Sequence, residues 1–152
     1  MADERDSTQV IQLVETPYDL EGRDIVCYPN LILLFKIGIH RLFMKPRIVY
    51  STIAVDLVKG EAARANKFPS SQRIEISNEA LIPQMIAAPD AMEAATQIVL
   101  KWLRHKYKIY KPPELELIKR QEVYKAFFYT QDHKQEPLLV DSVKGIELDD
   151  PE

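Results

Sequence analysis

The chain has 152 residues, enough for one domain or for two small halves that share a core. Its composition, 46% hydrophobic and 28% charged, is too apolar for wholesale disorder. The net charge of -3 lacks the strongly basic footprint of a nucleic-acid-binding domain. A single cysteine, Cys27, excludes an intramolecular disulfide.

Acidic residues gather at the two ends of the chain. The first six and last six residues hold 7 of the 23 acids and 1 of the 20 bases, which leaves 19 bases and 16 acids over residues 7–146. We therefore expect residues 1–8 and 149–152 to be acidic, disordered tails on a mildly basic body.

The most apolar stretch, residues 25–44, is interrupted by Pro29, Lys36 and Arg41. A membrane span needs about 18 apolar residues in a row, so the sequence predicts none. The chain opens without a basic and apolar signal. The default expectation is a soluble cytoplasmic protein, although a segment cut from a larger exported or membrane protein would have the same pattern.

Residues 9–76 read as a strand-rich half. Residues 9–15 are β-rich, and residues 31–40 place apolar side chains at every second position, which predicts a strand with one buried face. These side chains are Leu31, Leu33, Phe35, Ile37 and Ile39. Residues 48–55 predict a second strand, joined to the first as an antiparallel hairpin through a connection at 41–46, and residues 73–76 predict a short edge strand.

A linker loop at residues 77–89 precedes the clearest helix, at about residues 90–108. Pro83 and Pro89 are expected to block a helix before Asp90, which stands at the N-cap with Glu93 three residues later, a capping box. The apolar stripe of this helix comprises Ala91, Ala94, Ala95, Ile98, Val99 and Trp102.

Three further strands are expected after the helix, at residues 114–118, 123–129 and 138–140. Residues 90–148 then form a helix followed by antiparallel strands. The predicted fold class is α+β, with one or two antiparallel sheets packed against one main helix.

A hexapeptide occurs twice, as Val-Asp-Leu-Val-Lys-Gly at residues 55–60 and Val-Asp-Ser-Val-Lys-Gly at residues 140–145. The match indicates a degenerate internal repeat. Aspartate followed by glycine is typical of a turn, so we expect structural turns at Asp56 with Gly60 and at Asp141 with Gly145. The alternative is an enzyme in which Asp56 and Asp141 share a site as paired carboxylates.

Residues 101–111 hold five Lys or Arg and three aromatic residues. This composition can grip phosphates and stack bases, and it predicts an anion or nucleic-acid surface. Cations at a helix C-terminus also complement the helix dipole, so the run has a purely structural explanation as well. The candidate binding cations are Lys101, Arg104, Lys106, Lys108 and Lys111.

The sequence offers no catalytic, metal or cofactor signature. The three histidines, His40, His105 and His133, and Cys27 follow no spacing that metal sites use. Cys27 is expected to be a small buried residue. We therefore expect no enzyme activity and no cofactor.

Residues 90–148 resemble the PepSY group of cystatin-like bacterial domains. The resemblance rests on Ala91-Met92-Glu93-Ala94-Ala95, on the strand through Val123–Tyr129, and on the ending Leu139-Val140-Asp141-Ser142-Val143-Lys144-Gly145. A second, degenerate copy is suggested at residues 9–61. The resemblance implies a non-enzymatic binding or regulatory module, often extracytoplasmic and sometimes linked to peptidase control.

The functional hypothesis from the sequence is a non-catalytic module that binds another protein through a sheet face or an edge strand. Tyr124 and Phe128 are candidate contacts, together with the acidic tail. For these two aromatic residues, the alternative is that they belong to the core. The alternative is a nucleic-acid or anion binder that uses the basic and aromatic run at residues 101–111.

Overall fold

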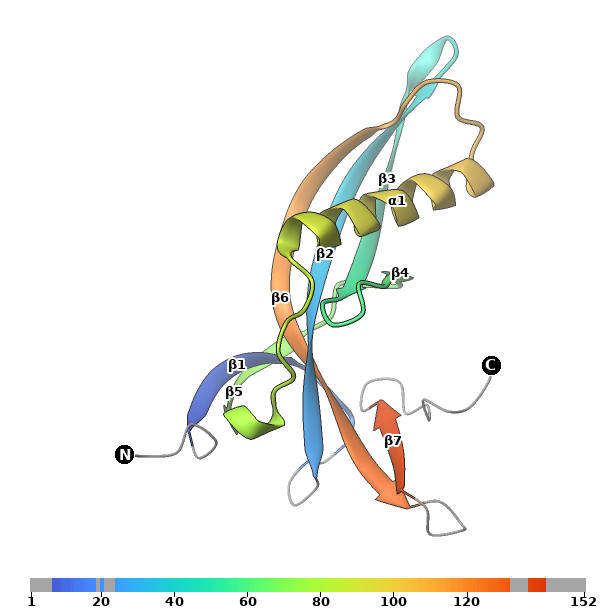
Figure 1. Cartoon of the computed structure of the whole chain (residues 1–152). Coiled ribbons are helices and arrows are strands. Elements are labelled where there is room, and N and C mark those ends of the chain that lie inside the picture. The colour runs from blue at the N-terminus through green and yellow to red at the C-terminus, as the bar shows by residue number, and fades with distance from the viewer. Residues whose placement is uncertain (1–6, 19, 21–23, 132–136, 142–152) are drawn as a thin grey trace. The chain divides into compact units, whose positions relative to one another are not determined.

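The structure, a computed structural model, describes residues 7–18, 20, 24–131 and 137–141 (Figure 1). Within those residues it contains seven strands, one α-helix and one turn of 3-10 helix, η2, so the α+β class is confirmed. The elements are β1 (Thr8–Val14), β2 (Ile25–Arg41), β3 (Met44–Asp56), β4 (Ala62–Ala65), β5 (Ser71–Ser77), η2 (Asn78–Ala80), α1 (Ala88–Lys106), β6 (Glu114–Gln131) and β7 (Pro137–Asp141).

Two compact units make up the chain, and neither is a continuous segment. Unit 1 comprises residues 1–29, 69–84 and 123–152, and unit 2 comprises residues 30–68 and 85–122. Most of the predicted acidic tails lies outside the described residues, but Thr8 belongs to β1.

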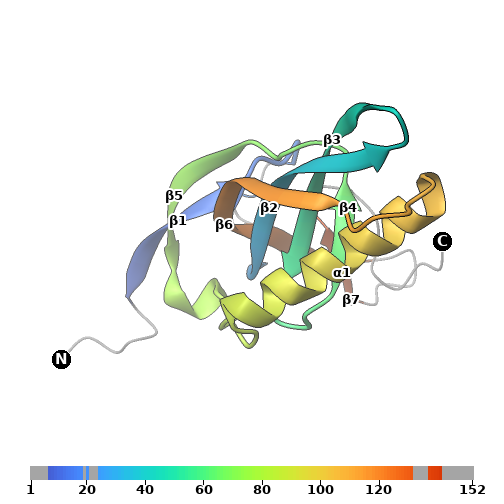
Figure 2. The ribbon, with the colours of Figure 1, turned by 90° about the horizontal axis from the view of Figure 1, so that it is seen from above.

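Unit 2 is built on the hairpin of β2 and β3, which pair antiparallel from Asn30 opposite Asp56 to Arg41 opposite Met44. The predicted buried face of residues 31–39 is confirmed, because its five alternating apolar side chains are at most 4% exposed. β4 pairs with the other edge of β3. α1 packs on β3 and β4, and it runs along the buried face of the hairpin (Figure 2).

α1 buries one row of apolar residues against this face. The buried positions are spaced by four residues and therefore lie in one row along the helix: Ala91, Ala95, Val99 and Leu103. Alanine near the start of the row lets the helix backbone approach the strands. In the described part of the chain, no helix combines the length and the apolar composition that crossing a membrane requires.

The predicted start of the helix is wrong in its details. The N-cap is Ala87, which makes no side-chain cap bond, and Asp90 lies inside the first turn instead of capping it. Pro89 does not block the helix, because the first backbone N–H groups have no partner within a helix and proline is tolerated there. The helix also ends at Lys106, two residues before the predicted end.

Unit 1 contains a parallel strand pair, which corrects the prediction of purely antiparallel sheets. β1 pairs antiparallel with β5 along its whole length and parallel with β6 at Leu13 opposite Tyr124. β7 pairs antiparallel with β6. The core of this unit is formed by Ile11, Leu13, Cys27 and Ala126. The strand predicted at residues 73–76 is confirmed as β5, at the end of the strand order.

Two strands are longer than the sequence patterns indicate. β6 runs as one strand of 18 residues where two separate strands were expected, and β2 begins at Ile25 and includes Pro29. Proline lacks the N–H group that a strand ladder uses. The pairing of β2 with β3 begins at Asn30, directly after Pro29, so that ladder does not need the missing N–H.

The end of β3 forms the turn that the first hexapeptide predicts. Asp56 Oδ1 accepts hydrogen bonds from the backbone N–H groups of Val58, at 2.7 Å, and Lys59, at 3.1 Å. Gly60 has a φ of 80°, a conformation that side chains disfavour, and its N–H donates to the Asp56 carbonyl. Asp141 ends β7, while Gly145 lies outside the described residues, so the internal repeat stays a prediction.

Asp56→Ala should lower the free energy of unfolding by about 2 kcal/mol, because two backbone N–H groups lose a charged acceptor. Asp56→Asn keeps an acceptor oxygen and should cost less. Urea unfolding of the three proteins, followed by the fluorescence of Trp102, measures both changes. An alanine variant as stable as the wild type would show that the carboxylate does not hold the turn.

Candidate binding groove at the end of the helix

After α1 the chain becomes extended at Tyr107, and it does not continue the helix. Tyr107, the C-cap residue, has φ -126° and ψ 155°, and its N–H donates to the Leu103 carbonyl at 2.8 Å. Pro112 and Pro113 cannot donate a backbone hydrogen bond, and Pro112 also disfavours a helical Lys111. The segment therefore runs alongside the last turns of α1 before β6 begins, and it leaves a space between them.

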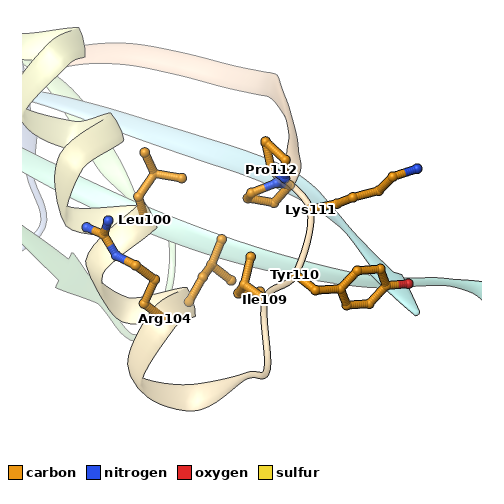
Figure 3. A pocket seen from close by; sticks show the side chains of 8 residues that line it. Leu100, Arg104, Ile109, Tyr110, Lys111 and Pro112 are labelled. Carbon is orange, nitrogen blue, oxygen red and sulfur yellow. The ribbon is translucent and has the colours of Figure 1, made fainter. Parts of the chain in front are cut away.

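This space is a groove of about 340 Å³. Its walls are mostly apolar and come from the last turns of α1 and from the following loop: Leu100, Leu103, Arg104, Ile109, Tyr110, Lys111, Pro112 and Pro113. In Figure 3, Leu100 and Ile109 lie on facing sides of the groove. We call this site the helix-end groove.

Two cations border the helix-end groove. Arg104 lies on the helix side, and Lys111 lies on the loop, beyond Tyr110 (Figure 3). Both side chains are exposed, and Tyr110 keeps about half of its surface in solvent. The groove thus offers apolar walls with a cation on either side, and the Tyr110 ring points away from these walls (Figure 3).

The other two aromatic residues of the basic run are already engaged. The Trp102 and Tyr107 rings meet edge to face with centroids 5.9 Å apart. The guanidinium of Arg64 lies 3.8 Å from the Trp102 ring centroid, and that of Arg47 lies 4.9 Å from the Tyr107 centroid. The ammonium of Lys106 is within 6 Å of both rings. Both rings therefore serve as cation partners within unit 2.

The structure divides the predicted binding cations into three groups. Arg104 and Lys111 come together at the helix-end groove, and Lys106 belongs to the aromatic cluster. Lys101 and Lys108 are exposed and do not line the groove.

The two aromatic contacts predicted on β6 are less available than the sequence suggests. Phe128 is 3% exposed and its ring lies 5.2 Å from that of Tyr18, so it is a packed residue of unit 1. Tyr124 is half-buried against the core of the same unit. Residues 123–129 are apolar or aromatic at most positions, so the sequence shows no clear alternation that would identify the buried side chains.

The sequence does not indicate that Arg64 belongs to this region. Arg64 lies on β4, whose sequence Ala-Ala-Arg-Ala carries no strand signal, and it also approaches Ser51 Oγ at 3.4 Å. Arg47 lies beyond the hairpin turn on β3. Only the pairing of β3 with β2 and β4 brings these side chains to the helix end.

The remaining candidates are Cys27, Asp56 and Asp141. Among the described residues, no group of three or more His, Cys, Asp or Glu side chains could hold a metal ion. Cys27 is fully buried in unit 1, and burial raises the pKa of its thiol to about 11. Asp56 caps its own turn, and the side chain of Asp141 lies outside the described residues.

No family model, no curated protein and no solved structure matches this chain. The resemblance to PepSY domains accordingly stays a prediction.

Proposed function

We propose that this chain is a non-catalytic binding module that receives an acidic segment of another protein in the helix-end groove. One observation carries this proposal, the meeting of apolar walls with Arg104 and Lys111 in a single groove of unit 2. A segment that presents an apolar side chain next to carboxylates would fill the groove and pair with both cations.

The groove supports this proposal better than a sheet face or an edge strand does. The aromatic contacts expected on β6 are buried or half-buried, as Phe128 and Tyr124 show. A concave apolar site with a few polar groups at its rim is the usual form of a ligand site in proteins.

The same region favours an acidic peptide over a nucleic acid. Single-stranded nucleic acids bind by stacking their bases on exposed aromatic rings. Trp102 and Tyr107 are already covered by Arg64, Arg47 and Lys106, which leaves Tyr110 as the stacking ring at the groove. A single ring and two cations make a poor platform for a nucleic-acid strand.

The side chains that line the groove also supply no ordinary catalytic base. They include two cations and a phenol but no carboxylate, thiol or imidazole. The groove is therefore suited to holding a ligand, and chemical conversion of the ligand would need groups from elsewhere.

The double substitution Arg104→Glu with Lys111→Glu should weaken the binding of an acidic peptide by at least about tenfold, because two attractions become repulsions. Suitable peptides can be selected by phage display on the immobilised wild-type chain. We expect enriched peptides in which leucine, isoleucine or phenylalanine alternates with aspartate and glutamate. Fluorescence anisotropy of the selected peptides then gives the dissociation constants.

The matched control is Lys101→Glu with Lys108→Glu, which changes the net charge equally but lies outside the groove lining. This control should bind nearly as the wild type does. Equal losses in the two double variants would mean that only net charge matters, and enrichment of non-acidic peptides would contradict the proposal. Displacement of the peptide by poly(U) at low salt would instead support the nucleic-acid alternative.

A further inference from the structure

The turn between β2 and β3 presents three large apolar side chains to solvent. Leu42 and Phe43 form the two-residue loop, since Arg41 pairs with Met44. Phe43 is fully exposed, and Leu42 and Met44 are each more than 60% exposed. The β2–β3 turn extends beyond the part of β3 that α1 and β4 cover in unit 2 (Figure 1). We call residues 41–47 the hairpin tip.

Phe43 occupies a backbone position that favours other residues. Its φ is 59°, in the left-handed region, where a bulky side chain is disfavoured. Two-residue hairpin loops prefer asparagine or glycine at such positions. Neither turn geometry nor core packing thus accounts for phenylalanine at Phe43. A residue that is strained and exposed at the same time points to a contact outside the unit.

The charge around the hairpin tip is of one sign. Residues 25–55 contain no aspartate or glutamate. The tip itself carries Arg41, Lys45 and Arg47, all exposed, and Arg41 Nε donates to the Lys45 carbonyl at 2.9 Å. An acid from outside the hairpin, Glu114, lies next to His40, with 3.9 Å between Glu114 Oε1 and His40 Nε2.

We propose that the hairpin tip inserts Leu42, Phe43 and Met44 into the interface of an anionic lipid bilayer, with Arg41 and Lys45 at the level of the headgroups. Apolar side chains flanked by cations are the pattern by which peripheral segments enter such interfaces. A protein partner would need a pocket shaped for this narrow apex, whereas a lipid interface accepts it without one. The hairpin tip and the helix-end groove share no residue, so this inference is independent of the proposed function.

Co-sedimentation of the full chain with vesicles tests the proposal. We expect binding to vesicles of phosphatidylcholine with phosphatidylserine, and little binding to phosphatidylcholine alone. Phe43→Asn should weaken the binding by about tenfold or more, because the inserted ring is lost. The same substitution should raise the Tm by roughly 2–4 °C, because asparagine tolerates the left-handed backbone.

Met85→Asn is the matched control, since Met85 is also an exposed apolar residue of unit 2 but lies outside the tip. It should leave vesicle binding unchanged. Leu100→Ala, which alters a wall of the helix-end groove and keeps the net charge, should also leave the insertion of the tip unchanged.

A second readout reports insertion directly. Phe43→Cys can be labelled with an environment-sensitive dye, because the native Cys27 is fully buried. The dye emission should shift to the blue when anionic vesicles are added. A wild-type chain that stays in the supernatant, a Phe43→Asn variant that binds equally well, or an unchanged dye spectrum would each overturn the proposal. So would a vesicle-free dimer that Phe43→Asn returns to monomer, since the tip would then contact a second copy of this chain.

Discussion

Leu33→Ala should lower the free energy of unfolding by about 2–5 kcal/mol, the range for a buried leucine whose site cannot collapse. Leu33 is fully buried on β2 and lies opposite Ile53 in the core that α1 covers. β2 lies between β3 and β6 in the sheet, so the neighbours of Leu33 have little freedom to close the cavity.

Leu42→Ala is the control for this prediction, because it removes the same atoms from an exposed position at the end of the same hairpin. Its effect should stay within about 0.5 kcal/mol. Trp102 is the single tryptophan of the chain and belongs to unit 2, so its fluorescence during urea unfolding reports on the unit that contains both positions. Equal effects of the two substitutions would contradict the arrangement of the buried face.

The buried face of β2 and the body of α1 could be predicted because their patterns are local. Alternation at every second residue from Leu31 to Ile39 requires a strand with one buried side, and the row from Ala91 to Val99 requires a helix. In both cases the hydrophobic period is set by the geometry of the element itself. The partner that covers each face did not have to be known.

The strand pairing could not be predicted to the same extent. The parallel contact of β1 with β6 joins Leu13 to Tyr124, and no local signal links residues so far apart in the chain. β4 forms from Ala62 to Ala65, residues of low strand propensity, because β3 offers it an open edge. Tertiary contacts decide both features.

The candidate sites could likewise be predicted only in part, because tertiary contacts decide which side chains come together. The sequence placed cations and aromatic residues at residues 101–111, yet composition alone could not separate Arg104 and Lys111 at the groove from Lys106 in the aromatic cluster. The exposure of Phe43 was equally hidden, because residues 41–46 were expected to be an ordinary connection.

Cys27 should react with thiol reagents about 100-fold more slowly in the native chain than in the unfolded chain at pH 8. Restricted access of the reagent to the buried thiol should slow the native reaction further. Burial raises the pKa of its thiol from 9.0 to about 11, and the reactive species is the thiolate. The rate of labelling with a disulfide reagent, in buffer and in concentrated urea, measures the ratio. A small cysteine-containing peptide under both conditions corrects for the effect of urea on the reagent.

The same pKa shift makes the stability of the chain fall at high pH. The unfolded thiol loses its proton near pH 9, while the native thiol keeps it until about pH 11. Below pH 9 both states hold the proton and the contribution of Cys27 is fully present. Between pH 9 and pH 11 only the unfolded state is stabilised by ionisation, so the free energy of unfolding decreases by up to about 2–3 kcal/mol.

Lysine and tyrosine titrate in the same range, and the difference between the wild type and Cys27→Ala removes their effect. Since the alanine variant has no thiol to ionise, the two curves of stability against pH should converge as the pH rises from 9 to 11. Curves that stay parallel would show that the thiol is not shielded from water in unit 1.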